Sequence, residues 1–160
     1  MANVHASASQ HMYPSATAHP DHDGTLSRHA HEAYGLLHLA FVIAPVVAGL
    51  DKFFHLLTDW DKYVAPVVAR ALPMSVHTFM SVVGVIEIAA GLLVLFRPRL
   101  GAYVVAAWLV GIVLNLVLTG GYLDIALRDV GLFLGALALA RLSLEHDQTA
   151  RAPRGLRAER

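Results

Sequence analysis

Glu87 is the only ionisable residue between positions 78 and 96, and it lies near the middle of that apolar stretch. As a helix with a rise of about 1.5 Å per residue, residues 77–96 would extend about 30 Å, which matches the hydrocarbon core of a bilayer. A carboxyl group at that depth is costly unless it is protonated or paired. We therefore predict that a neighbouring helix supplies a partner for Glu87.

The remaining polar residues of the apolar segments concentrate at one end of the expected bundle. If the segments lie at a common depth, six polar residues share the outer third of the bundle, and Glu87 lies deeper. The six are Lys52, His55, His77, Asn115, Arg128 and Asp129. One interpretation is a polar pocket that holds a quinone headgroup or relays a proton, because charged residues within membrane segments usually face the interior. The other is a structural network in which Lys52 or Arg128 neutralises Glu87 and nothing binds. No catalytic residue is identified.

The histidines suggest two further chemistries. His55 and His77 lie at similar depth on adjacent segments, which is the minimum for bis-histidine haem ligation. No second pair lies deeper, so we do not expect haem. The first 31 residues hold six histidines, and four of them are candidates for weak divalent-metal binding: His19, His22, His29 and His31. Their irregular spacing predicts no defined metal site.

The composition of the chain indicates a membrane protein of one domain. Of 160 residues, 56% are hydrophobic and only 15% are charged, and the charges avoid four long apolar runs. The chain has no cysteine. This excludes disulfides, thiol redox chemistry, cysteine-bound iron–sulfur clusters and thioether-linked haem, so redox work would need a bound cofactor, a quinone or a partner subunit.

The pattern of apolar segments predicts an all-α fold, a bundle of four transmembrane helices at about 33–57, 77–96, 100–118 and 125–144. The last segment reaches spanning length only by including Arg128 and Asp129. Between the first two segments, residues 58–74 carry an apolar stripe with charges elsewhere, which predicts a short helix in the membrane interface. We expect residues 1–30 to be a disordered tail, 31–145 the membrane domain and 146–160 a basic tail.

Two further patterns concern packing and orientation. Gly84 and Gly91 share a helical face with Glu87, so a neighbouring helix can approach the acid closely. Arginines gather in the connection at 97–99 and near the C-terminal end, which predicts a plasma-membrane protein with both termini cytoplasmic. We expect the basic C-terminal tail to contact anionic lipid, and we do not expect nucleic acid binding.

Three motifs together resemble the DoxX/DoxD family of small four-helix membrane proteins: GLDKFF (49–54), GVIEIAAGLLVLF (84–96) and RPRLGAYVVAAW (97–108). The family shows a glycine followed by a lysine near the end of its first helix, and a Glu-Ile/Leu-x-Gly-Gly-like stretch in its second. Lys52 and Glu87 match these positions. Ala90 replaces the first glycine after the acid, and Gly91 matches the second. The resemblance covers about residues 33–142.

The resemblance implies a membrane subunit of a redox system. Some family members are membrane subunits of a thiosulfate:quinone oxidoreductase, and others are linked to oxidative stress or sulfur redox systems. The absence of cysteine removes a thiol as sulfur carrier here. We therefore expect an accessory, quinone-linked membrane subunit with a redox partner or a homo-oligomer. The alternatives are a quinone-linked oxidoreductase, with Glu87 as proton acceptor and Lys52 or Arg128 on a carbonyl oxygen, and a small proton-coupled transporter.

Overall fold

The computed structural model describes the backbone of residues 20–151 and the side chains of residues 28–146. This part of the chain is helical and contains no strand, so the prediction of an all-α fold is confirmed. The elements in chain order are α1 (Pro20–Phe54), the 3₁₀ turn η1 (Asp61–Tyr63), α2 (Pro66–Ala71), α3 (Val76–Phe96), α4 (Pro98–Thr119) and α5 (Leu123–Arg151).

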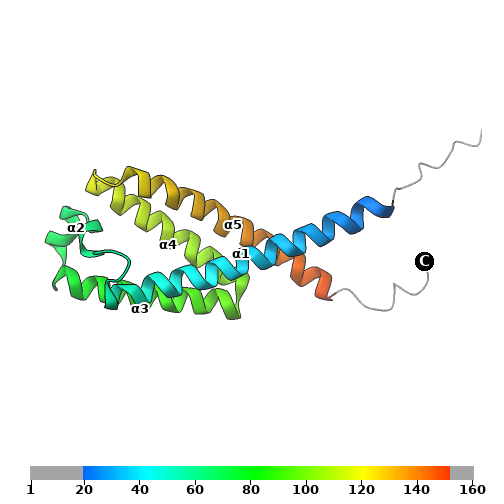
Figure 1. Cartoon of the computed structure of the whole chain (residues 1–160), viewed down its shortest axis with the longest axis horizontal. Helices are drawn as coiled ribbons and strands as arrows, with labels where there is room; N and C mark the ends of the chain where they lie inside the picture. The colour runs from blue at the N-terminus through cyan, green and yellow to red at the C-terminus, as the bar shows by residue number, and fades with distance from the viewer. Residues whose placement is uncertain (1–19, 152–160) are drawn as a thin grey trace, which may run out of the picture.

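The four long helices form two packed pairs. α1 lies against α3, and α4 lies against α5, while contacts of α3 with α4 and of α1 with α5 join the pairs. The start of α1 and the end of α5 lie at one end of the molecule, and α2 lies at the opposite end (Figure 1). We call this opposite end, where α1 finishes and α3 begins, the α2 end.

Within the described part of the chain, three helices are long and apolar enough to cross a membrane: Arg28–Phe54 of α1, all of α3 and all of α4. Their outward faces carry large apolar side chains, among them Leu36, Val85 and Leu114, which are 72%, 58% and 59% exposed. Such continuous apolar surface suits contact with lipid rather than water. α5 is also long, but charged residues at both of its ends shorten its apolar stretch.

α1 is displaced toward the N-terminus from the expected 33–57. It begins at Pro20, so residues 20–30 are helical rather than part of a disordered tail, and the earlier residues lie outside the described part. Proline is favoured in the first helical turn, and a spacing of four places Arg28 beside Glu32, 3.7 Å away. α1 ends at Phe54 because the next residue, His55, adopts a left-handed backbone with φ of 54°.

The expected interfacial helix of residues 58–74 is divided into η1 and α2. Pro66 has no N–H to continue a helix that begins before it, and it occupies the first position of α2 instead. α2 packs against α4, and η1 contacts both α3 and α4. The segment between α1 and α3 therefore folds over the α2 end of the bundle.

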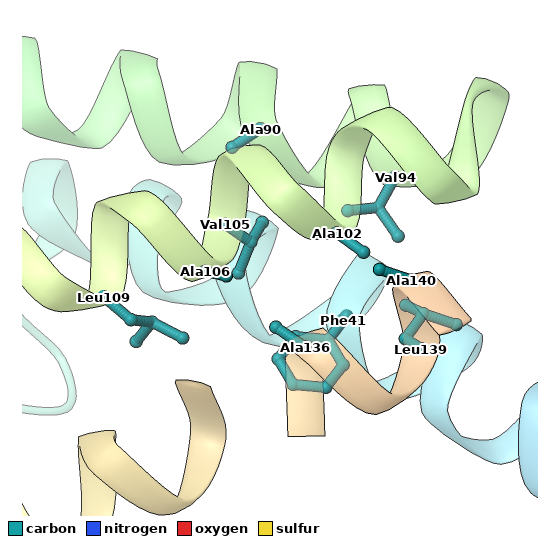
Figure 2. Packing of buried hydrophobic residues seen from close by; sticks show 10 residues of the cluster. All are labelled: Phe41, Ala90, Val94, Ala102, Val105, Ala106, Leu109, Ala136, Leu139 and Ala140. Atoms are coloured by element: carbon teal, nitrogen blue, oxygen red, sulfur yellow. The ribbon is translucent and has the colours of Figure 1, made fainter. Parts of the chain in front are cut away.

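The apolar core lies where α1 crosses the other helices, and small side chains dominate it. Figure 2 shows Phe41 of α1 beside Ala136 and Leu139 of α5, with Val94 of α3 close by. Leu139 and Val94 are fully buried. The alanines let the helix backbones come close, and the few larger residues fill the remaining space. This packing fixes the relative positions of the helices that carry the polar residues.

Candidate functional site

α1 and α3 approach most closely at two glycines. A Cβ added to Gly49 would lie 2.5 Å from the carbonyl oxygen of Gly84, and one added to Gly84 would lie 2.6 Å from that of Gly49. Any side chain at either position would therefore push the backbones apart. Gly91, seven residues further along α3, also lies against α1: a Cβ added there would lie 2.7 Å from Cγ2 of Val46 and 2.9 Å from the carbonyl oxygen of Val42. The small-residue face predicted around Glu87 is the face that α1 packs against.

Lys52 and Glu87 form a buried ion pair across this contact. Lys52 Nζ lies 2.5 Å from Glu87 Oε2, and the two side chains are 2% and 9% exposed. Side chains lean toward the N-terminus of their helix, and α1 and α3 run in opposite directions, so the two side chains extend toward each other. Lys52 Nζ also lies 3.4 Å from the carbonyl oxygen of Ala48. Lys52 is therefore the cation that neutralises Glu87.

An aromatic side chain covers the lysine from the α2 end. Lys52 Nζ lies 3.8 Å from the centroid of a Trp60 ring, a cation–π contact. The indole N–H of Trp60 donates to Asp51 Oδ2 at 2.8 Å. Asp51 also accepts hydrogen bonds from the backbone N–H groups of Leu56 and Leu57, at 2.8 and 3.1 Å. Asp51 thus folds the chain back after α1 and holds Trp60 over the ion pair.

A second acid and a second tryptophan lie near the pair. Asp129 of α5 is 4% exposed and acts electrostatically on Glu87. The indole N–H of Trp108 on α4 is buried close to the Glu87 carboxyl group without a hydrogen bond of standard geometry. The surroundings of Glu87 therefore draw on all four long helices.

Arg128 does not join this group. Its side chain is 64% exposed, and its Nε and Nη2 both lie 3.0 Å from Oδ1 of Asp129, its neighbour in α5. Of the two cations predicted to neutralise Glu87, Lys52 is therefore the partner and Arg128 is not. Adjacent residues on a helix point about 100° apart, so Asp129 faces inward while Arg128 faces outward.

Asn115 has a structural position in α4. Its side-chain oxygen accepts from the N–H of Ala65 at 3.0 Å, and its nitrogen donates to the carbonyl oxygen of Tyr63 at 2.6 Å. Both partners belong to the segment between α1 and α3. Thr119, one turn later in α4, lies 3.5 Å from the same Tyr63 carbonyl. Asn115 therefore anchors the covering segment rather than lining the surroundings of Glu87.

The two histidines at the α2 end meet each other. The rings of His55 and His77 are stacked, with centroids 5.2 Å apart. His77 Nδ1 lies 3.6 Å from Oδ2 of Asp61, at the start of η1. Ligand atoms of the three residues all lie within 4.8 Å of one another. These residues form a separate polar cluster beyond the ion pair.

The tail histidines are distributed differently. His29 lies 3.6 Å from Glu32 within α1. The His31 ring packs against that of His146 on α5, with centroids 4.7 Å apart. His19 lies outside the described residues, and only the backbone of His22 is described. No joint metal site of His29 and His31 is found among the described side chains.

A shallow, open apolar surface runs along the outward side of α1, and we call it the apolar groove. Its lining residues are Leu36, Leu39, Ala40, Ile43, Ala44, Val47, Ala48 and Leu57. One end of the groove reaches two residues that belong to the surroundings of the ion pair. Ala48 offers its carbonyl oxygen to Lys52, and Leu57 donates its N–H to Asp51. The groove therefore extends from the outward surface of α1 to the segment that covers the pair.

Four residues of these sites are absent from the sequence-based prediction of site residues: Asp51, Trp60, Asp61 and Trp108. Asp51 carries a signal, since an acid near the end of an apolar segment can bind the N–H groups that follow the helix. Trp60 is predicted only as part of an apolar stripe. Asp61 has no local signal, because its proximity to His77 depends on how the segment folds over the bundle.

The sequence matches no protein-family model, and comparisons with curated proteins and with solved structures give no match.

Proposed function

We propose that this chain is a membrane subunit of a quinone-linked redox system, related to the DoxX/DoxD family, with α1, α3, α4 and α5 as its four membrane spans. The observation that carries the proposal is the buried Lys52–Glu87 ion pair beside a lipid-facing apolar groove. An even number of spans agrees with the position of both helix termini at one end of the molecule. Arg97 and Arg99 lie where α3 ends and α4 begins, away from the α2 end, and by the positive-inside rule they support a cytoplasmic location for the helix termini.

The groove and the ion pair suit the two parts of a quinone. An isoprenoid tail is apolar and would lie in the groove along α1, while the headgroup would reach the segment at Leu57. Reduction of a quinone to a quinol consumes two electrons and two protons. Glu87 offers a group that exchanges a proton, and Lys52 offers an ammonium that can donate to a carbonyl oxygen. The electrons would come from a redox partner subunit.

The structure supports an accessory role more strongly than independent catalysis. Lys52 is 2% exposed and covered by Trp60, so a headgroup reaches it only if the covering segment moves. A partner bound at the α2 end would contact this segment directly. The pair would then hold the segment closed until a partner and a quinone are both present. An oxidoreductase active on its own stays an alternative within the same proposal.

The test is to measure the quinone and subunits that remain with the protein after mild detergent purification from native membranes. Ala44→Phe fills the groove, and Ala107→Phe places the same ring on a lipid-exposed position of α4. We expect quinone in stoichiometric amount in the wild type and in Ala107→Phe, and a loss of at least about tenfold in Ala44→Phe. Equal quinone content in both variants, or only trace quinone in the wild type, would contradict the proposal.

Proton-coupled transport is the second candidate, and one observation favours it. Glu87 and Asp129 are two buried acids on different helices, within electrostatic reach of each other. Such acids in membrane proteins often form proton pathways. In liposomes, proton-coupled flux that disappears in Glu87→Gln and Asp129→Asn would favour transport. Quinone retention without such flux would favour the redox subunit.

A further inference from the structure

We propose that His55, Asp61 and His77 bind a divalent transition-metal ion, with Zn²⁺ as the representative. The three residues come from different elements: His55 directly follows α1, Asp61 begins η1, and His77 lies in the first turn of α3. One ligand atom from each lies within 4.8 Å of the other two. The site is independent of the proposed redox function, because it needs neither the groove nor the ion pair.

The ligand types and spacing suit a small transition-metal ion. Zn²⁺ binds imidazole nitrogen and carboxylate oxygen at about 2.0–2.2 Å, so two ligands at a tetrahedral angle lie about 3.4 Å apart. His77 Nδ1 and Asp61 Oδ2 are 3.6 Å apart. That distance is long for a direct hydrogen bond but close to the edge of a metal tetrahedron. A ring nitrogen of His55 lies within 4.8 Å of both atoms, so the His55 ring would have to turn toward them to complete the site.

The carboxyl group of Asp61 has an unsatisfied oxygen. Its Oδ1 is buried and has no hydrogen-bond partner. A buried acceptor without a donor is costly, and a cation bound to the carboxylate would offset that cost. The backbone N–H of Asp61 donates to Asp59 Oδ1 at 3.1 Å, which fixes the start of η1. The aspartate is therefore positioned by the backbone while its own carboxylate still lacks a donor at one oxygen.

His55 is also held in place by its backbone. Its φ of 54° is a left-handed conformation that costs energy for any residue except glycine. Its N–H donates to the carbonyl oxygen of Asp51 at 2.7 Å. The stacked ring of His77 then limits where the imidazole of His55 can move. Two histidines and one carboxylate leave a fourth coordination position for water or an external ligand.

Metal binding would fasten the segment that covers the buried ion pair. Asp61 directly follows Trp60, whose ring lies over Lys52 Nζ. A metal ion bound by Asp61, His55 and His77 would link this segment to the end of α1 and to the start of α3, and would therefore restrain it. We therefore expect metal binding to raise the melting temperature of the folded protein as well as to occur with a stoichiometry of one per chain.

The experiment is a titration of the purified, chelator-treated full-length protein with Zn²⁺, by calorimetry, and with Co²⁺, by visible absorption. The histidine-rich N-terminal tail is a competing site, so the titration is repeated in a full-length variant with His5, His11, His19, His22 and His29 changed to Asn. We expect one site per chain to persist in this tail variant, a tetrahedral-type Co²⁺ spectrum and a higher melting temperature with Zn²⁺. Loss of the site in the tail variant would overturn the proposal.

Ligand variants complete the test. His77 is exposed, so His77→Ala should not disturb the fold. Asp61→Asn keeps the shape of the side chain and removes its charge. His55→Gly removes the imidazole and relieves the strain of the left-handed backbone. In the tail-variant background, we expect each to weaken Zn²⁺ binding by more than about 100-fold and to abolish the rise in melting temperature. Asp124→Asn changes an exposed carboxylate in the first turn of α5, away from the site, and this matched control should bind normally. Unchanged binding in His77→Ala and His55→Gly would contradict the site.

Discussion

Among the cation–acid pairs of the described residues, Lys52–Glu87 and Arg128–Asp129 have completely different surroundings. Lys52 and Glu87 come from different helices and are both buried. Arg128 and Asp129 are neighbours in α5, and only the acid is buried. Both pairs look similar in the sequence, since each places charge near an apolar segment. The comparison shows that a buried acid pairs with a cation of another helix where that helix packs closely against it.

The close approach of α1 and α3 explains the difference. Gly49 and Gly84 bring the two backbones together, and Lys52 and Glu87 each lie one turn from this contact on opposing helices. No glycine of α5 makes a comparable contact beside Asp129, since nothing lies within 4 Å of a Cβ added to Gly131. Arg128 therefore pairs with Asp129, its neighbour in α5, and not with an acid of another helix.

The largest expected effect is loss of one partner of the Lys52–Glu87 pair. Lys52→Ala leaves the carboxyl group of Glu87 buried without its cation, so we expect a loss of about 3–5 kcal/mol in the free energy of unfolding. Denaturant unfolding in detergent micelles, followed by circular dichroism, measures this change. A change below about 1 kcal/mol would show that the pair contributes little to the fold.

The control for this prediction removes both charges together. Lys52→Met with Glu87→Leu replaces the pair by apolar side chains of similar size, so we expect most of the lost stability to return. The same double variant should lose any quinone that depends on the pair. Stability without quinone would separate the structural role of the pair from its proposed chemical role.

The second prediction concerns the glycines that bring the helices together. In Gly84→Ala the new Cβ would lie 2.6 Å from the carbonyl oxygen of Gly49, so α1 and α3 must separate. We expect a loss of about 1–3 kcal/mol in the free energy of unfolding. Gly111→Ala is the matched control, because nothing lies within 4 Å of a Cβ there. That control should be neutral or up to about 1 kcal/mol more stable.

The sequence predicts the close contact between α1 and α3 well, and it predicts the residues at the α2 end poorly. The glycines at positions 84 and 91 and the isolated acid indicate a helix that must pack closely and supply a cation. These features depend on helical periodicity alone. The positions of Trp60 and Asp61 depend on Pro66, on the backbone of His55 and on hydrogen bonds to Asp51, and no single one of these fixes the path of the segment. Arg128 was misplaced because depth in the bundle does not specify the direction of a side chain.

A third prediction tests the cover of the ion pair. Trp60→Leu removes both the cation–π contact with Lys52 and the hydrogen bond to Asp51, so we expect a loss of about 1–2 kcal/mol in the free energy of unfolding. Trp60→Phe keeps an aromatic face without the N–H donor. If the ring provides most of the stabilisation, Trp60→Phe should lie closer to the wild type than to Trp60→Leu. Equal losses in both variants would assign the effect to the hydrogen bond.

The smallest effect is expected at the other pair. Arg128 is 64% exposed, so solvent can replace much of its interaction with Asp129, and Arg128→Ala should cost less than about 1 kcal/mol of unfolding free energy. The same denaturant unfolding measures it, and Arg128→Lys is the control that retains a charge. A loss in Arg128→Ala as large as that in Lys52→Ala would contradict the distinction between the two pairs. It would mean that Asp129, as well as Glu87, is an acid whose charge the bundle must balance.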